Sequence, residues 1–247
     1  MDKKLNLSIV KAFRLLDFFT DKKKEWGVRE LALKSGYNKS TTYRLLRTLE
    51  NLHVVHQKSN EKYCLGSKLF ELGNRVAIYE SLINATKHIV KTIAKDIRET
   101  VLFGVLKEDQ VFYISKAESP QGLKISTSIG SYQPLHATAM GKILLAFSSE
   151  QKKKSLLATI PFQAYTAQTI ANMNQLENEL LKVQKNRYAL DLEEYELGLI
   201  CIAIPVFNKN QEFIGSISAS GPSSRFELRN VESYLKLMRK EADRIQF

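Results

Sequence analysis

The chain has 247 residues, of which 44% are hydrophobic and 26% are charged, as is typical of a globular protein with one large domain or two unequal ones. No apolar stretch approaches the ~18 residues that span a bilayer, and the first residues lack the apolar core of a signal peptide, so we expect a cytosolic protein that makes no membrane contact. Cys64 and Cys201 lie far apart, which argues against a disulfide framework or a zinc site.

The net charge of +11 is concentrated near the amino terminus. Residues 1–66 carry 14 Lys and Arg against 7 Asp and Glu, which leaves a net +4 for the rest of the chain. Such a surplus is typical of proteins that bind a polyanion, either nucleic acid or an anionic membrane surface, although it also favours solubility. The charge by itself leaves these interpretations open.

Three helices are predicted near the amino terminus, at residues 8–19, 28–34 and 40–51, because apolar residues recur there at helical spacing. The apolar stripe of the first helix is formed by Ile9, Ala12, Phe13, Leu16 and Phe19. Ser8 is a suitable cap for that helix. Gly36 is expected to end the second helix, because glycine adopts the left-handed conformation at little cost.

The third predicted helix has an apolar face and a basic, hydroxyl-rich face. The apolar face consists of Thr42, Leu45, Leu46 and Leu49. A hairpin is predicted next, with strands at residues 54–58 and 62–65 on either side of a polar turn. Helix, short helix, glycine turn, helix and hairpin in this order predict a winged helix-turn-helix.

In such a fold the third helix enters the major groove of DNA, with its amino-terminal half nearest the bases. Hydroxyl groups can bond phosphates or bases, and arginine can bind guanine through two hydrogen bonds. We therefore expect a double-stranded DNA operator as partner. The predicted DNA-binding residues are Lys39, Ser40, Thr41, Tyr43, Arg44 and Arg47 on the helix, with Lys58 and Lys62 beside the hairpin tip. The alternatives are that Arg44 and Arg47 are solvated surface charges and that Tyr43 packs on a neighbouring helix.

Helices and hairpins alternate in the rest of the chain. Further helices are predicted at residues 67–79, 82–97, 138–147, 150–157, 174–186 and 225–245, and strands at 101–106, 111–115, 200–206 and 213–219. This mixture predicts an α+β domain with an antiparallel sheet. We divide the chain into a winged helix-turn-helix DNA-binding domain at residues 1–66, a linker helix at 67–80 and a larger domain at 81–247.

The sequences VRELA at residues 28–32 and KSTTYRLL at residues 39–46 resemble the DNA-binding domain of the IclR family of bacterial transcriptional regulators. YCLG at residues 63–66 is similar to the family's transition from wing to linker. Asn38 stands where the family commonly has proline, at the entry to the recognition helix, and asparagine is an acceptable cap there.

The resemblance continues through three segments in family order, at residues 134–142, 191–206 and 215–225, and so covers nearly the whole chain. It implies a GAF/profilin-like carboxyl-terminal domain that binds a small-molecule effector. The residues that it implies for the effector pocket are Ala139, Met140, Asp191, Cys201, Ser218 and Ser220.

The residue types agree with that implied pocket. A helix that begins near Ala139 offers N–H groups to an anion, and Ser218 and Ser220 alternate along a strand and so share a face. A small carboxylate is the expected effector, with Asp191 accepting from a ligand hydroxyl. Leu123, Ile125 and Ile129 are candidates for apolar walls. Without the resemblance, Cys201 would be interpreted as a core thiol, the serines as ordinary strand residues and Asp191 as a loop stabiliser.

The family resemblance implies a repressor that its effector releases, although an activator would have the same sequence features. We expect a homodimer or a dimer of dimers, with residues 67–79 as the dimer element. An enzyme that uses Cys201 and His136 is a remote alternative, because nothing in the sequence brings the two together. His53 and His56 lack further ligands at metal spacing, so no catalytic residue, metal or cofactor is expected.

Overall fold

The computed structural model describes residues 5–20, 23–77, 79–122 and 127–245. Contacts within the chain divide it into two compact units, Met1–Ile78 and Tyr79–Phe247. No helix in the described residues combines the length and the apolarity that crossing a membrane requires.

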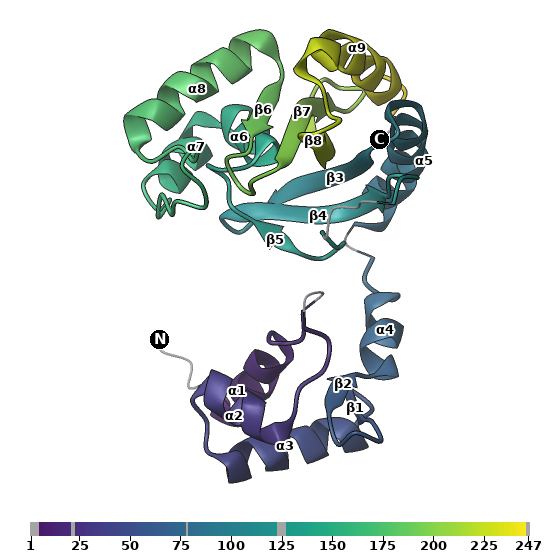
Figure 1. Ribbon diagram of the computed structural model, residues 1–247, viewed down its shortest axis with the longest axis vertical. Helices are drawn as coiled ribbons and strands as arrows, with labels where there is room; N and C mark the ends of the chain where they lie inside the picture. The colour runs from purple at the N-terminus through teal and green to yellow at the C-terminus, as the bar shows by residue number, and fades with distance from the viewer. Residues whose placement is uncertain (1–4, 21–22, 78, 123–126, 246–247) are drawn as a thin grey trace. The chain divides into compact units, whose positions relative to one another are not determined.

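The first unit is a winged helix-turn-helix, as predicted (Figure 1). Its elements are α1 (Leu7–Leu16), α2 (Val28–Ser35), α3 (Lys39–Asn51), β1 (Val55–Gln57), β2 (Tyr63–Leu65) and α4 (Ser67–Gly73). The two strands form an antiparallel hairpin, and Trp26 joins it through backbone hydrogen bonds with Tyr63 of 3.0 and 2.8 Å. The buried core comprises Phe19, Trp26, Leu31, Leu46, Leu49, Val55 and Tyr63. The hairpin is thereby fixed to the helices.

The first helix differs from its prediction at both ends. The side-chain oxygen of Asn6, rather than that of Ser8, caps α1 by accepting hydrogen bonds from the N–H groups of Ser8 and Ile9. The helix ends at Leu16. Ile9 and Phe13 were expected in the core but are 57% and 63% exposed. The reason is that α1 packs through another side of the helix. Leu15 is fully buried, and Ala12 and Leu16 pack against the core, so the apolar residues of α1 cover two faces.

The second and third helices follow their patterns closely. Gly36 ends α2 at φ 71°, in the left-handed region, which confirms the predicted cap. On α3, Thr42, Leu46 and Leu49 are buried. The helix predicted at residues 67–79 is shorter than expected, and α4 ends at Gly73.

The second unit is an α+β domain with a six-stranded antiparallel sheet in its described residues, in agreement with the predicted class. Its strands are β3 (Thr100–Lys107), β4 (Gln110–Ala117), β5 (Tyr132–Gln133), β6 (Ala189–Leu192), β7 (Leu199–Phe207) and β8 (Phe213–Pro222), in the order β5-β4-β3-β8-β7-β6. Its helices are α5 (Glu80–Ile97), α6 (Ala139–Ala146), α7 (Glu150–Leu157), α8 (Met173–Asn186) and α9 (Val231–Ala242).

Alternation along the strands sorts side chains onto two covered faces. Val101 and Phe103 pack in the core that includes α5 and α9, whereas Leu102 between them packs in the core that includes α6, α7 and α8. Ile202 and Cys201 divide in the same way on β7. The two helical layers are visible on opposite sides of the sheet in Figure 1.

Two short strands and one helix start were not predicted. β5 has two residues and β6 has four, too few to produce a recognisable alternation. The last helix begins at Val231 rather than near residue 225. A 3₁₀ helix (Leu228–Asn230) precedes it, and a turn before that buries Phe226 completely. The turn interrupts what looked like one helical pattern in the sequence.

Candidate DNA-binding surface and effector pocket

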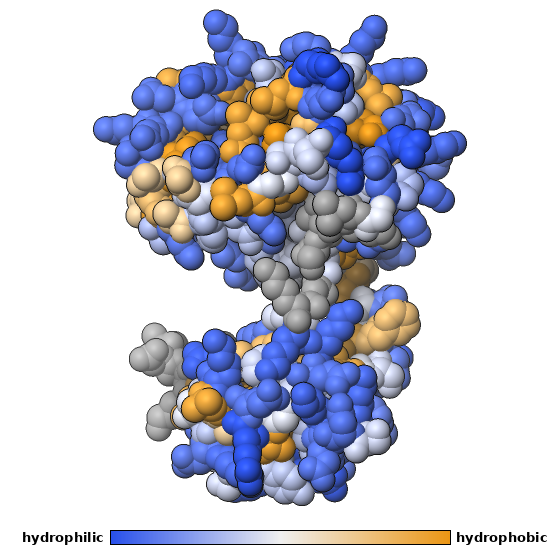
Figure 2. All heavy atoms as spheres, in the orientation of Figure 1, coloured by the Kyte–Doolittle hydropathy of each residue, from blue (hydrophilic) through white to orange (hydrophobic). Residues whose placement is uncertain are grey.

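The polar face of α3 is turned toward solvent. Lys39, Ser40, Tyr43, Arg44 and Arg47 are exposed, and Thr41 is half-buried. The apolar stripe of the same helix packs on the core, so the geometry of the helix forces its basic side outward. Tyr43 is 50% exposed, so it is not a core residue and part of its surface is open to a partner. Hydrophilic residues cover most of the visible face of this unit in Figure 2.

A broad groove of about 1030 Å³ lies between the starts of α2 and α3 and the hairpin. Lys39, Ser40 and Tyr43 line it from α3, and Lys62 lines it from the hairpin. These side chains, predicted from separate stretches of sequence, therefore converge on one surface. Arg29, at the start of α2, lines the same groove and was not predicted.

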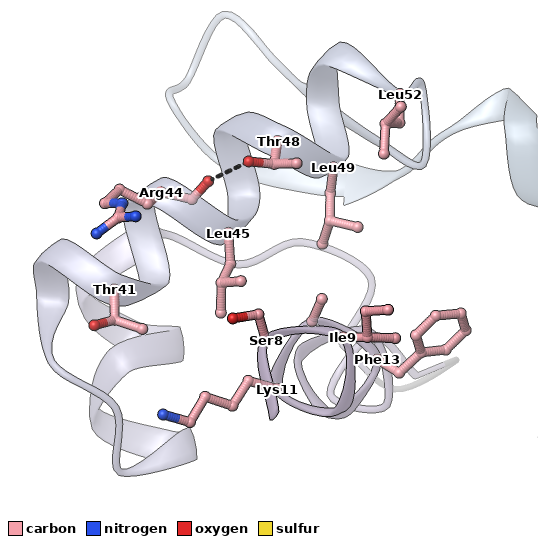
Figure 3. A pocket seen from close by; sticks show the side chains of 11 residues that line it. Ser8, Ile9, Lys11, Phe13, Thr41, Arg44, Leu45, Thr48, Leu49 and Leu52 are labelled. Atoms are coloured by element: carbon pink, nitrogen blue, oxygen red, sulfur yellow. Dashed lines mark hydrogen bonds between the residues drawn. The ribbon is translucent and has the colours of Figure 1, made fainter. Parts of the chain in front are cut away.

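A second groove, of about 550 Å³, separates α1 from the other side of α3 (Figure 3). Thr41 and Arg44 line its polar part together with Lys11 of α1. The exposed Ile9 and Phe13 of α1 line its apolar part. Five of the six predicted DNA-binding residues of α3 are thus divided between two grooves, and Arg47 lines neither of them. The helical pattern alone did not indicate this division.

The cations of this surface are not equally available. Arg47 donates to Glu50 at 2.6 Å, and Lys58 forms an ion pair with Glu25, which Asn60 also contacts. These hydrogen bonds from Lys58 and Asn60 hold the pKa of Glu25 below its usual value.

By contrast, Lys39, Arg44 and Lys62 take part in no ion pair within the described part of the chain. A phosphate or a base could engage these three without breaking an existing ion pair, and the same holds for the exposed Arg29.

The second unit contains a small enclosed cavity of about 30 Å³ between the sheet and the start of α6. All six residues that the sequence analysis assigned to an effector pocket line it: Ala139, Met140, Asp191, Cys201, Ser218 and Ser220. The register of the sheet explains part of this convergence, because Asp191 is paired with Cys201 and Cys201 with Ser220 on three adjacent strands. The hydroxyls of Ser218 and Ser220 lie 3.3 Å apart on the same face.

The amino terminus of α6 supplies backbone donors to the cavity. Thr138 caps the helix by accepting a 3.0 Å hydrogen bond from the N–H of Gly141. The N–H groups of Ala139 and Met140 have no partner among the described residues. A Cβ on Gly141 would lie 2.3 Å from the carbonyl oxygen of Leu135, so only glycine permits the close approach that places this helix start.

Asp191 is almost completely buried at 1% exposure. Its Oδ1 accepts hydrogen bonds from the N–H groups of Glu194 at 2.7 Å and Tyr195 at 3.4 Å. Burial raises the pKa of Asp191 to about 7, although these hydrogen bonds and the Lys142 ammonium oppose the rise. Burial also raises the pKa of the Cys201 thiol well above its usual value. The cavity therefore contains a carboxyl that titrates near neutrality and a thiol that stays protonated.

Sequence reasoning missed the residues that support Asp191. The ammonium of Lys142 donates to Glu194 at 2.5 Å and to the carbonyl of Leu190 at 2.8 Å. Tyr113 and Tyr195 also line the cavity and were not predicted. The available signal was Lys142 itself, the single charged residue in the otherwise apolar helix AMGKILLA. A lone lysine in such a helix indicates a buried ion pair but does not identify its partner.

Several predicted residues lie elsewhere. Leu123 and Ile125 fall outside the described residues, and Ile129 is 58% exposed and does not line the cavity. His136 is bonded through Nε2 to the Gln163 carbonyl at 3.0 Å and does not line the cavity in which Cys201 lies.

The catalytic alternative therefore gains no support from the arrangement. Burial lowers the pKa of His136. The Cys201 thiol is buried and protonated, and His136, the base of that alternative, does not line its cavity. The described residues contain no cluster of His, Cys, Asp and Glu suited to a metal ion.

A winged helix-turn-helix in one chain with a domain that encloses a polar cavity is the organisation of a ligand-responsive transcription regulator. Residues 8–59 match the model of the IclR helix-turn-helix domain, and residues 75–247 match that of the bacterial transcriptional regulator IclR C-terminal domain. The chain belongs to the IclR family of bacterial transcriptional regulators.

Individual relatives agree. The HTH-type transcriptional regulator KdgR of Dickeya chrysanthemi is 36% identical over 239 residues, covering 96% of this chain and 78% of that protein. The acetate operon repressor of Salmonella typhimurium is 30% identical over 221 residues, covering 88% of this chain and 81% of that protein. The crystal structure of Thermotoga maritima IclR has a TM-score of 0.77 at 30% identity and covers 97% of each chain. The curated relatives are named as regulators of transcription rather than as enzymes.

Proposed function

We propose that this helix-turn-helix regulator is a cytoplasmic repressor that binds its operator as a homodimer or a dimer of dimers and loses operator affinity when a small carboxylate occupies the cavity. The basic face of α3 carries the DNA-binding part of this proposal, since Lys39 and Arg44 are exposed without ion pairs in the described residues. The name of the acetate operon repressor supports repression over activation.

Residues 1–66 would bind DNA, 67–80 would link, and 81–247 would sense the effector. The proposed base or phosphate contacts are Lys39, Ser40, Thr41, Tyr43, Arg44, Arg47, Lys58 and Lys62. Selection of duplexes from a random library by the full-length protein should enrich one motif. A purified protein that retains no duplex in dilute buffer would contradict the proposal, because basic surfaces bind DNA most strongly at low salt.

The cavity supports a small carboxylate as effector. Two backbone N–H groups at a helix start, beside the serine pair of β8, form an anion site with a favourable helix dipole. The proposed contacts are Ala139, Met140, Asp191, Cys201, Ser218 and Ser220. In a screen of small carboxylates, the acid that raises the melting temperature of the protein should have no such effect on the Asp191→Ala, Ser218→Ala double variant. That variant should still bind the selected duplex, whereas a variant that responds normally would refute the assignment.

The segment α4 supports a homodimer. It is a helix of seven residues with no buried side chain, and Phe70 is 75% exposed. Such a short helix is unstable in water without packing, so a partner surface is expected to cover it. Sedimentation of Phe70→Glu should show a smaller species than the wild type, whereas Leu33→Glu, a change at an 88% exposed leucine of α2, should not. Equal sedimentation of both variants and the wild type would exclude α4 as the dimer element.

Repression and activation are separated by a reporter gene placed behind the selected operator. Deletion of the regulator should raise expression if it represses and lower expression if it activates. The effector's influence on operator affinity is limited by its preference for one state of the protein, typically about 1–3 kcal/mol.

A further inference from the structure

The charges buried beside the cavity do not balance. Lys142 and Glu194 form an ion pair at 2.5 Å with side chains only 2% and 10% exposed. Asp191, at 1% exposure, lies beside this pair and accepts the N–H of Glu194. One buried ammonium therefore accompanies two buried carboxyl groups, and Glu194 holds it. Asp191 is the carboxyl without a cation of its own.

The other groups that face Asp191 supply no positive charge. Cys201 faces it from β7, Tyr113 from β4 and Tyr195 from the loop after β6. Glu196 lines the same cavity, and Glu179 of α8 adds a negative charge near Glu194. Among the described residues, no Lys, Arg or His lines the cavity. An ionised Asp191 would therefore stand next to a bound anion with the nearest ammonium, that of Lys142, already paired with Glu194.

A carboxylate at the start of α6 would be attracted by the N–H groups of Ala139 and Met140 and repelled by an ionised Asp191. With its proton in place, the same side chain would instead donate a hydrogen bond to the ligand. We propose that Lys142 and Glu194 neutralise each other so that Asp191 enters the binding reaction as a neutral acid, and that the cavity consequently takes up a small carboxylate together with one proton. This inference rests on the proposed effector function and adds the form in which the acid is bound.

The proton balance is simple. At a pH where Asp191 is ionised, one proton from solvent joins its carboxylate as the anion binds, and no other covalent bond changes. Because burial raises the pKa of Asp191 to about 7, this uptake falls in the physiological range. One proton per ligand gives at most about a tenfold loss of affinity for each pH unit above that value.

Acetate is a suitable probe, because a cavity of about 30 Å³ admits only a very small acid without rearrangement. Acetamide has the same shape without the charge. Thermal shift and titration calorimetry on the full-length protein should show that acetate binds about tenfold or more weakly at about pH 8.5 than at about pH 6, with acetamide indifferent to pH. Calorimetry in two buffers of different ionisation enthalpy should show an uptake approaching one proton per acetate at the higher pH.

Each negative outcome has its own meaning. Acetate that binds equally at both pH values, or without proton uptake, would overturn the proton linkage and leave the carboxylate effector standing. Acetate that binds at neither pH would overturn this inference, whereas the small-carboxylate effector itself is tested by the screen of small carboxylates.

Variants test the assignment of the proton and of the positioning pair. Asp191→Asn is a permanently neutral donor and should bind acetate without dependence on pH. Glu194→Gln releases Lys142, whose ammonium should then hold Asp191 ionised, so the fall in acetate affinity should begin at a lower pH. The double variant Lys142→Met, Glu194→Gln removes both charges. Its acetate affinity should fall at about the same pH as that of the wild type, or at a higher pH.

A purely structural role for the pair would weaken binding in both variants without separating their pH profiles. Identical profiles for Glu194→Gln and the double variant would therefore overturn the positioning role. Circular dichroism and retention of the selected duplex show that each variant is folded. If Glu194→Gln does not fold, the double variant can still be compared with the wild type. A fall in its acetate affinity that begins at a lower pH than in the wild type would contradict the proposal.

Discussion

In the first unit the candidate functional side chains are exposed on one helix and one hairpin, whereas in the second they lie on α6, β6, β7 and β8 around an enclosed cavity. Water solvates the charges of the first surface, so Lys39 and Arg44 can remain without partners in the described chain. In the second unit the charge of Lys142 is matched by Glu194, 52 residues away. An exposed site thus keeps its charged side chains available to a partner. A buried site must pair its charges with opposite ones or keep its carboxyl groups protonated and neutral.

The largest expected effect tests the buried side of this comparison in the absence of ligand. The folded protein raises the pKa of Asp191 from 3.8 to about 7, so it holds a proton that the unfolded chain releases. This contribution to stability is complete at pH below about 4 and is lost as the pH rises through about 7. Relative to Asp191→Asn, the free energy of unfolding of the wild type should fall by on the order of 3 kcal/mol between about pH 5 and about pH 8.

Denaturant unfolding at several pH values measures this difference. Asp96→Asn, which changes an exposed aspartate on α5, controls for the loss of a surface charge. Parallel curves for the wild type and Asp191→Asn would show that Asp191 is ionised in the folded protein throughout this range, which would undermine the contrast between the two sites.

The same contrast decides how much of the molecule the sequence could predict. For α3, polar and apolar residues alternate at helical spacing, so the pattern identified both the buried Leu46 and the exposed Arg44. On β8 the alternation placed Ser218 and Ser220 on one face, and the 3.3 Å separation of their hydroxyls agrees. Local periodicity was sufficient wherever a single element carries the site.

Periodicity failed where the answer depends on a distant partner. The stripe of α1 suggested that Ile9 and Phe13 are core residues, yet which of two apolar faces is buried depends on how α1 packs on α3. β6 has four residues and no visible alternation, so Asp191 was found by resemblance alone. The Lys142–Glu194 pair joins α6 to a loop that the sequence does not show to be adjacent.

A smaller effect is expected when the exposed site loses its central side chain. Arg44 is free of ion pairs in the described residues and is exposed on α3, so a two-bond contact with guanine is open to it. Arg44→Ala should reduce discrimination between the selected duplex and a scrambled one by about 1–3 kcal/mol. Binding to both duplexes across a range of salt concentrations measures this loss.

Arg14→Ala, at an exposed arginine of α1, is the matched control and should leave the discrimination unchanged. Arg44 also lines the groove against α1. Equal discrimination by Arg44→Ala and the wild type would contradict a contact between Arg44 and the bases and leave only its place in that groove.

The smallest effect distinguishes two lysines of the hairpin that were both predicted to contact DNA. Lys62 has no ion pair in the described part of the chain, whereas Lys58 is bound to Glu25, and that contact raises the pKa of Lys58. If Lys62 contacts a phosphate, Lys62→Ala should reduce the slope of log affinity against log salt by about 0.9, the value for one released counterion. Lys58→Ala should change the slope less, because binding DNA through Lys58 would first require breaking its contact with Glu25. Glu25→Gln frees Lys58 and should increase the slope. Equal slopes for the two lysine variants would show that the ion pair does not limit the hairpin's contact with DNA.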